Sequence, residues 1–525
     1  MTIEESVAAG YDFQGPALEL GGLMTDADTL TPTRVRVPLG MLNRHGLVAG
    51  ATGTGKTKTL QLLAEQLSAA GVPVFAADVK GDLSGLQTPG EPSEALTERA
   101  AGVGQQWTAT GFPVEYYALG GRGIGVPLRV TMDSFGPTLL SKVLDLNDTQ
   151  ESSLALVFHY AATQGWALVD LADLRAVVSY LISDEGKAEL KALGGLSSAT
   201  AGVILRELVA FEAAGGAAFF GAPAFDPADL LTVMPDGRGL VSLVELPELA
   251  DKPVVFSTFL MWLLGELFRT LPEEGDLDKP KLVFFFDEAH LLFSDASKAF
   301  LEQVEQTVRL IRSKGVGVFF VTQSPTDVPD SVLGQLGSRI QHQLRAHTPN
   351  DAKALKATVN TYPSSAYDDL GSVITSLGIG EAVVTVMNER GAPTPVAWTR
   401  LRAPESLMDP TPAEQMQAVV AASPRQAAYA AVQDVDSAAD EIAARQQAAQ
   451  AEAERAAAEE AAAKESARAE KAEKAATRRT TSRSRGGRRD GGDDSVVEQV
   501  VRSKVFQQAA RTAARELVKG LFRRR

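Results

Sequence analysis

Apolar residues in the first four hundred positions fall into two alternating patterns, short continuous runs and longer stretches with a period of three to four. Continuous runs bounded by turn residues predict buried strands, and the longer period predicts helices. The predicted strands are "GLVAG" (46–50), "VPVFAAD" (72–78), "GLVSLVEL" (239–246), "KLVFFFDEAH" (281–290), "GVGVFFVTQ" (315–323) and "RIQHQLRA" (339–346). Since nearly pure apolar strands are typical of sheets covered on both faces, we predict an α/β fold with a parallel-rich central sheet.

Helical periodicity separates these strands and dominates one long segment between them. We expect helices over residues 56–70, 253–271 and 298–313, and a helical insertion over about 133–220. Residues 380–401 predict a hairpin with a turn at 388–392. We therefore assign one domain to residues 34–405, preceded by a short, turn-rich lead-in.

The composition changes after about residue 405. Residues 406–475 form an Ala/Glu-rich segment that we interpret as a solvated helical linker, since its apolar residues beyond 440 are nearly all alanine. Residues 476–494 are rich in arginine and glycine and predict disorder. This stretch either binds phosphates non-specifically or serves as a solubilising linker. An amphipathic helix is expected over 495–525, either docking on the chain itself or mediating self-association, with a membrane surface as a weaker alternative.

The overall composition narrows the classes of function. The 525 residues carry a net charge of −15 and no cysteine, which excludes disulfides, thiolate zinc sites and cysteine nucleophiles. An acidic total argues against a protein that coats nucleic acid, but a motor can confine its basic surface to a pore. No signal peptide is visible, and the longest apolar run, 253–268, is short and contains Glu266. We expect a cytoplasmic protein with no stable membrane span.

A phosphate-binding loop lies between the first predicted strand of the domain and its helix. It fits the Walker A pattern G-x-x-x-x-G-K-[ST] and comprises Gly50, Ala51, Thr52, Gly53, Thr54, Gly55, Lys56 and Thr57. Glycines allow backbone N–H groups to converge on phosphate oxygens, and the helix N-terminus favours anions. We expect Lys56 to bridge the β- and γ-phosphates and Thr57 to ligate Mg²⁺. Lys58 is included among the nucleotide-binding candidates, although it also simply begins the helix.

The strand "LVFFFDEAH" supplies the acidic partner of this loop. Asp287 is expected to hold Mg²⁺ through water, and Glu288 to polarise the attacking water. The additional glutamate and the lack of an Asn-Lys-x-Asp signature favour ATP over GTP. We treat the letters DEAH as coincidental, because no other signature of that helicase class is present. His290 either senses the nucleotide or caps local structure.

Polar residues at the next two strands complete the candidate site. Gln323, at the end of its strand, is a candidate to contact the γ-phosphate. Arg312 and Arg339 are candidate arginine fingers, and Arg309 is a weaker one. A finger supplied by a neighbouring subunit would require a ring, most often a hexamer.

These motifs together resemble the HerA/FtsK superfamily of ring-forming ATPases, most closely bacterial HerA-like proteins of the YjgR type. The resemblance covers about residues 10–405 and rests on the Walker A stretch, "DVKGDLSGL", "FFFDEAHLLF" and residues 308–346. It implies a RecA-like core, a homo-hexamer and ATP-driven DNA translocation. It also implies that Asp78 helps to order the active site, although a plain turn explains this residue equally well.

Two departures from the family pattern limit what the resemblance implies. Only about forty residues precede the Walker A loop, too few for the N-terminal β-barrel of HerA, and no DNA-reading module is recognisable. We therefore expect an ATP- and Mg²⁺-dependent hexameric DNA translocase or helicase, with a nuclease or another protein as candidate partner. The alternative is a regulatory or scaffolding ATPase whose nucleotide state controls assembly or partner binding.

Overall fold

Twelve strands join into one sheet in the computed structural model, which describes residues 2–249, 252–275, 277–293 and 298–483. The order across the sheet is β2-β1-β12-β11-β10-β3-β9-β8-β4-β7-β5-β6. Strands from β10 to β6 run parallel, and β11, β12, β1 and β2 extend that sheet in antiparallel pairs. The bounds are β1 (Ala17–Met24), β2 (Leu30–Pro38), β3 (Gly46–Ala49), β4 (Val74–Asp78), β5 (Val114–Leu119), β6 (Val126–Leu128), β7 (Val241–Glu245), β8 (Leu282–Phe286), β9 (Val316–Thr322), β10 (Ser338–Gln341), β11 (Glu381–Thr385) and β12 (Ala397–Leu401). The predicted parallel-rich α/β fold is confirmed.

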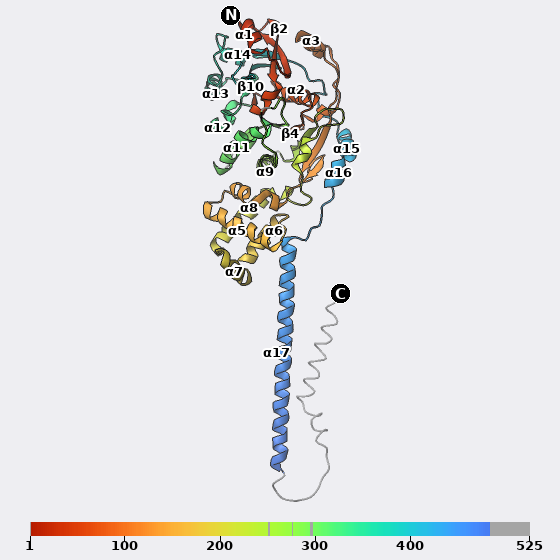
Figure 1. Ribbon diagram of the computed structural model, residues 1–525, viewed down its shortest axis with the longest axis vertical. Coiled ribbons are helices and arrows are strands. Elements are labelled where there is room, and N and C mark those ends of the chain that lie inside the picture. The colour runs from red at the N-terminus through yellow and green to blue at the C-terminus, as the bar shows by residue number, and fades with distance from the viewer. Residues whose placement is uncertain (1, 250–251, 276, 294–297, 484–525) are drawn as a thin grey trace. The chain divides into compact units, whose positions relative to one another are not determined.

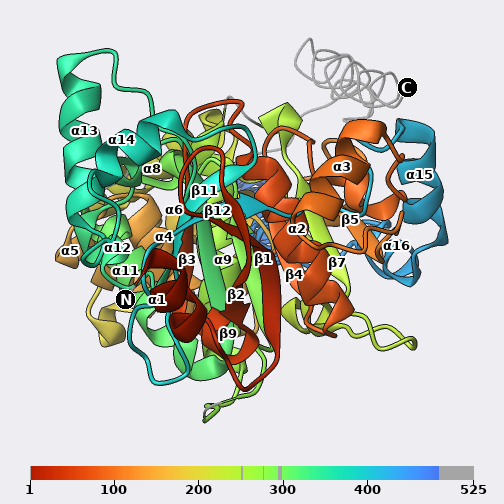
Figure 2. The same ribbon diagram turned by 90° about the horizontal axis from the view of Figure 1, so that it is seen from above.

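Helices cover both faces of the parallel part of the sheet. The connection from β3 to β4 runs in one direction across the sheet, and those from β7 to β8 and from β8 to β9 run in the other. Since such crossovers are right-handed, α2 lies on one face and α9 and α11 on the opposite face. Figures 1 and 2 show these layers. The helices outside the insertion are α1 (Ile3–Gly10), α2 (Lys56–Ala69), α3 (Glu94–Gly102), α9 (Pro253–Thr270), α10 (His290–Phe293), α11 (Lys298–Ile311), α12 (Asp330–Leu333), α13 (Pro349–Asn360), α14 (Leu370–Ser376), α15 (Ala413–Ala422) and α16 (Pro424–Tyr429).

Aromatic residues of the two central strands fill the core between these layers. Phe284 and Phe286 of β8 and Phe319 and Phe320 of β9 are buried. The rings of Phe286 and Phe320 stack with centroids 5.5 Å apart, across neighbouring strands. Successive side chains of a strand point to opposite faces, so a run of phenylalanines is stable only where both faces are covered.

The helical insertion predicted for about 133–220 is present as a separate group of helices below the sheet in Figure 1. It contains α4 (Met132–Val143), α5 (Asp148–Gln164), α6 (Leu171–Leu181), α7 (Asp184–Leu190) and α8 (Ser198–Ala213). Capping boxes at Asn147 and Asp170 begin α5 and α6, and Gly165 ends α5 with a left-handed φ of +72°. The apolar positions at helical spacing therefore predicted the insertion, and the caps are further local signals that delimit its helices.

The first 33 residues are not the irregular lead-in that the sequence suggested. They form α1, β1 and the start of β2, and β1 pairs along its length with β12 near the end of the domain. Gly21 of β1 lies opposite Leu401, where a Cβ would come within 2.0 Å of the Arg400 carbonyl oxygen. The prediction was wrong because glycines within β1 weaken its strand pattern, whereas its partner strand lies far away in the sequence.

The compact unit also extends beyond the predicted boundary at residue 405, since the chain divides into units 1–445 and 446–525. In the first unit, α15 and α16 pack beside β5 and β6. Arg425 of α16 pairs with Glu115 of β5 at 3.3 Å, and the Tyr429 hydroxyl donates to Asp229 at 2.8 Å. These contacts join an alanine-rich segment to the sheet, and composition alone could not reveal them.

The second unit is described only as far as residue 483, as the continuation of α17 (Ala438–Arg483). Its side chains from 446 to 475 are exposed, as predicted for a solvated helix. Residues 476–483 are helical although we predicted disorder from 476, since α17 continues through them to Arg483. The rest of the arginine-rich stretch and the amphipathic helix predicted for 495–525 lie outside the described residues.

None of the helices in the described part of the chain is both long and apolar enough to span a bilayer.

Candidate nucleotide-binding site

The Walker A residues form a loop at the carboxyl end of β3. The loop is tied to both neighbouring strands, because the Gly50 amide donates to Thr322 at 3.2 Å and the Ala51 amide to Gln343 at 2.8 Å. Gly50 approaches His342 so closely that a Cβ would lie 2.4 Å from the histidine Cβ. Gly55 caps α2 with a φ of +108°, a conformation that favours glycine. The loop therefore delivers its amides to the N-terminus of a helix, which is suited to bind phosphate.

The Lys56 ammonium lies inside this loop. Its Nζ donates to the carbonyl oxygens of Gly50 at 2.7 Å and Ala51 at 3.2 Å, and burial lowers the pKa of Lys56. Thr57 follows at the first turn of α2 and is half-buried. The Lys58 ammonium instead contacts the Met408 carbonyl oxygen, away from the loop. Lys56 thus lies in the expected position, whereas Lys58 has a contact elsewhere in the fold.

Three acidic residues end neighbouring parallel strands beside the loop. Asp78 ends β4 directly opposite Glu245 of β7, and Asp287 follows β8 on the other side of Asp78. Burial is the main cause that raises the pKa of each carboxyl, to about 6 for Asp78, about 8 for Glu245 and about 7 for Asp287. Glu245 was not recognised from the sequence, because its significance depends on which strands are neighbours.

Asp287 and Glu288 have different surroundings despite being adjacent. One Asp287 oxygen accepts the Glu288 amide at 2.9 Å, and the other is buried without a hydrogen-bond partner among the described residues. Glu288 adopts a φ of +48°, which is uncommon outside glycine and is typical of functional sites. A buried carboxylate oxygen lacking a partner suits a cation, so Asp287 and Thr57 fit Mg²⁺ held largely by nucleotide and water. The described residues contain no group of three or more histidine, cysteine, aspartate or glutamate side chains able to hold a metal ion by themselves.

The Glu288 carboxylate contacts two basic side chains. One oxygen forms an ion pair with the Lys80 ammonium, and the other lies 3.2 Å from His290 Nδ1 without hydrogen-bond alignment. Burial raises the pKa of Glu288, but the bond and charge of Lys80 outweigh it and leave the pKa below its ordinary value. Lys80 lies in a stretch that carries the family resemblance, but no role was predicted for it, because its contact with Glu288 depends on which strands are neighbours.

Asp78 and Gln323 complete this edge of the sheet. The Asp78 carboxylate accepts the backbone amides of Gly81, Asp82 and Leu83 at 2.8 to 3.2 Å, so it orders the following loop. Gln323 follows β9 and is exposed beside the loop, next to Thr322, whose carbonyl accepts the Gly50 amide. The structure thus brings together at one edge the Walker A loop, Asp78, Asp287, Glu288 and Gln323.

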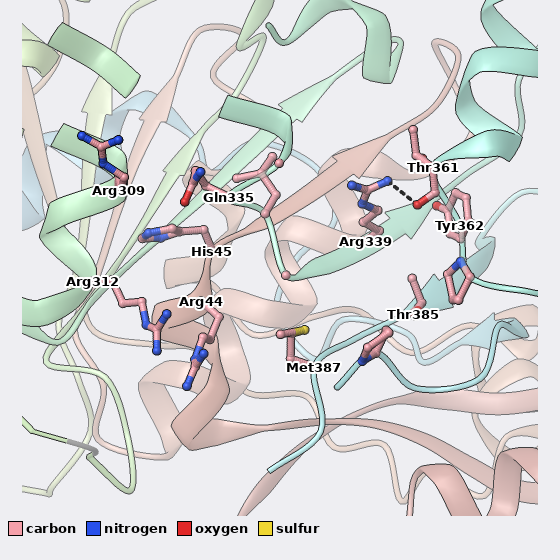
Figure 3. Close-up of a pocket in the computed structure, with 15 residues that line it drawn as sticks. Arg44, His45, Arg309, Arg312, Gln335, Arg339, Thr361, Tyr362, Thr385 and Met387 are labelled. Atoms are coloured by element: carbon pink, nitrogen blue, oxygen red, sulfur yellow. Dashed lines mark hydrogen bonds between the residues drawn. The ribbon is translucent and has the colours of Figure 1, made fainter. Parts of the chain in front are cut away.

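The predicted arginine fingers lie at the opposite end of the parallel strands, where β3, β9 and β10 begin. Arg309, Arg312 and Arg339 line a cavity of about 620 Å³ together with Arg44 (Figure 3). Arg44 precedes β3, Arg312 precedes β9, and Arg339 lies in β10 and donates to the Thr361 carbonyl at 2.9 Å. β3 has 4 residues and β9 has 7. At roughly 3.3 Å per residue, the two ends of these strands are therefore separated by roughly 13 to 23 Å. The arginines therefore lie far from the Walker A loop of their own chain.

His45 adds a buried donor to this arginine cavity. Its Nδ1 accepts the Val318 amide at 3.0 Å, and burial lowers its pKa to about 4, so the ring is neutral with its hydrogen on Nε2. That nitrogen is buried and has no hydrogen-bond partner among the described residues. Four guanidinium groups and an unpaired N–H suit an anion. Arg44 and His45 were not predicted, because only the neighbouring positions of β3, β9 and β10 bring them beside Arg312 and Arg339.

Comparisons with known proteins agree with this architecture. The family described as "Helicase HerA-like C-terminal" matches residues 24–525. The chain is similar to the solved structure of the bacterial conjugative coupling protein TrwBdeltaN70, with 15% identity, a TM-score of 0.51, and coverage of 78% of this chain and 94% of that one. It also matches TrwB in complex with ADP and Mg²⁺ (16% identity, TM-score 0.48, coverage 76% and 98%) and VirB4 of Thermoanaerobacter pseudethanolicus (14%, 0.45, 74% and 97%). A search of curated proteins gave no match. The similarity to TrwBdeltaN70 shows that the two chains share a RecA-like fold.

Proposed function

This chain belongs to the helicase HerA-like C-terminal family, and from that membership and its nucleotide site we propose that it is an ATP-hydrolysing motor. The observation that carries the proposal is the convergence of Lys56, Thr57, Asp287 and Glu288 at one edge of the sheet, beside the N-terminus of α2. Phosphate binding and water activation require these two sets of groups to be adjacent.

Each residue of this edge has a distinct role in the proposal. The loop amides and Lys56 bind the β- and γ-phosphates, with Lys56 leaving its carbonyl partners when nucleotide arrives. Thr57 and Asp287 would hold Mg²⁺, which would supply positive charge beside the phosphates. Glu288 orients water for attack on the γ-phosphorus and takes its proton, so that ATP and water give ADP and phosphate. Gln323 contacts the γ-phosphate and reports its loss.

The arginine cavity serves the nucleotide of a neighbouring copy in this proposal. Arg44, Arg309, Arg312 and Arg339 lie too far from their own Walker A loop to stabilise charge there. A head-to-tail ring apposes the two edges of successive subunits, and such an interface closes only at a defined number of copies. We propose a homo-hexamer, in which these arginines supply the finger in trans.

DNA is the proposed substrate of the motor, and a nuclease is the proposed partner. Family membership supports this part, and the protein would act in the cytoplasm, where both DNA and ATP are accessible. The test is the steady-state ATPase rate with and without double- or single-stranded DNA, using Glu288→Gln as the blank. Stimulation by DNA supports the motor. A Glu288-dependent rate that no DNA changes would favour the regulatory or scaffolding ATPase instead.

A further inference from the structure

The catalytic glutamate of the proposed motor is held in an ion pair within its own subunit. Lys80 pairs with one oxygen of Glu288, and the side chain of Glu288 is only 7% exposed. His290 lies beside the second oxygen. The carboxylate therefore has a basic group on each side. Among the described residues, Lys80 is the only lysine or arginine within ion-pair distance of Glu288.

The position of Lys80 is set by an ordered loop. Asp78 accepts the amides of all three residues from Gly81 to Leu83, and Gly81 adopts a φ of +76°, which favours glycine. The Asp78 carboxylate is buried at the end of β4, so this loop is anchored in the sheet. Lys80 projects from the anchored turn toward β8, and its backbone needs little further ordering to reach Glu288.

A carboxylate that is bound to an ammonium group is a poor catalyst of water attack. The ion pair occupies an oxygen that must accept the proton of water. Lys80 is 43% exposed, so its ammonium can leave Glu288 for solvent without being stranded in the core. Opening the pair therefore exposes the oxygen of Glu288 at modest cost.

We propose that Lys80 is a positioning residue that restrains Glu288 between turnovers, so that the loop of residues 79–83 regulates hydrolysis. This inference rests on the proposed function, because it assigns Lys80 a role through Glu288. Any movement of the loop, such as one that accompanies DNA binding or contact with a neighbouring subunit, then frees the glutamate. DNA stimulation of hydrolysis would act partly through this release.

The test compares Lys80→Met, which keeps the length of the side chain without its charge, with Lys80→Arg, which keeps the charge. Full-length wild type, both variants and Lys279→Met are assayed for kcat and KM with Mg²⁺ and ATP. Lys279 is an exposed lysine that donates to the carbonyl oxygens of Ala70 and Gly71, away from the site, and its variant controls for the loss of a surface charge. Nucleotide binding by each variant is measured with a fluorescent ADP.

Lys80→Met is expected to raise kcat without DNA by about two- to five-fold, the range set by a partly exposed ion pair, with KM unchanged. Lys80→Arg and Lys279→Met should behave as wild type, and any stimulation by DNA should shrink in Lys80→Met. An unchanged or lower kcat, or a higher KM with unchanged kcat, would overturn the inference. Absence of ATPase activity in the wild type would instead overturn the proposed function.

Discussion

Replacing Asp287 with asparagine should stabilise the protein while destroying its proposed activity. The side chain is buried, one oxygen has no hydrogen-bond partner among the described residues, and Glu288 and Asp78 lie close enough to repel its charge. Burial and these neighbours raise its pKa from 3.8 to about 7. That difference corresponds to about 4 kcal/mol, which the folded protein loses when Asp287 ionises.

The raised pKa of Asp287 determines whether its ionisation stabilises or destabilises the fold, and over which pH range. Below pH 4 the carboxyl is protonated in both states and costs nothing. Between pH 4 and pH 7 the unfolded chain has released this proton while the folded protein still holds it, so stability falls across this range and the full cost is present above pH 7. Asparagine keeps an oxygen for the Glu288 amide and carries no charge. The gain from Asp287→Asn should therefore be about 4 kcal/mol at pH 8 and about 2 kcal/mol at pH 5.5.

Thermal unfolding without nucleotide or Mg²⁺ measures this effect. For a unit of this size, about 4 kcal/mol corresponds to an increase of about 4 °C in the midpoint. Asp236→Asn is the matched control, since Asp236 is exposed and bonded to Arg238, which lowers its pKa. A midpoint that falls in Asp287→Asn, or a gain equal at both pH values, would refute the reasoning. Mg²⁺ and ATP should stabilise wild type but not this variant.

Three further changes test other parts of the site. Glu288→Gln should lower kcat by about 100-fold or more while fluorescent ATP still binds, and a matching loss of binding would contradict the assigned role. A double variant, Arg44→Ala with Arg312→Ala, should lose about 1,000-fold in kcat, and mixing it with Lys56→Ala should restore hydrolysis that neither has alone. Failure of the mixture to recover would argue against arginines acting in trans. Gly50→Ala should destabilise the Walker A loop by about 1 to 3 kcal/mol, because its new Cβ meets His342, and denaturation with and without nucleotide checks this.

The sequence predicted the central sheet and the nucleotide edge because their signals are local. The glycine-rich loop between a strand and a helix can be recognised from a few consecutive residues. The same holds for the apolar run that ends in Asp287 and Glu288. Apolar periodicity likewise predicted the helical insertion over about 133–220, whose helices run from Met132 to Ala213. The N-terminal strands were missed because β1 is a strand through its pairing with β12, more than 350 positions away.

The remaining features depend on which strands are neighbours, which periodicity does not encode. Lys80 and Glu288 are 208 positions apart and meet only because β4 and β8 pair in register. Glu245 faces Asp78 for the same reason. The arginine cavity gathers residues from segments that are far apart in the sequence, and spacing alone could propose Arg312 and Arg339 but could not place Arg44 and His45 beside them.

The central claim is that ATP hydrolysis at this site drives movement along DNA. Displacement of streptavidin from the end of biotinylated duplex or single-stranded DNA, measured with wild type and Glu288→Gln at equal DNA occupancy, tests it most directly. If ATP hydrolysis drives movement along DNA, streptavidin displacement requires ATP and Mg²⁺ and is lost in Glu288→Gln. Rapid, Glu288-dependent ATP turnover without displacement from either DNA would contradict it.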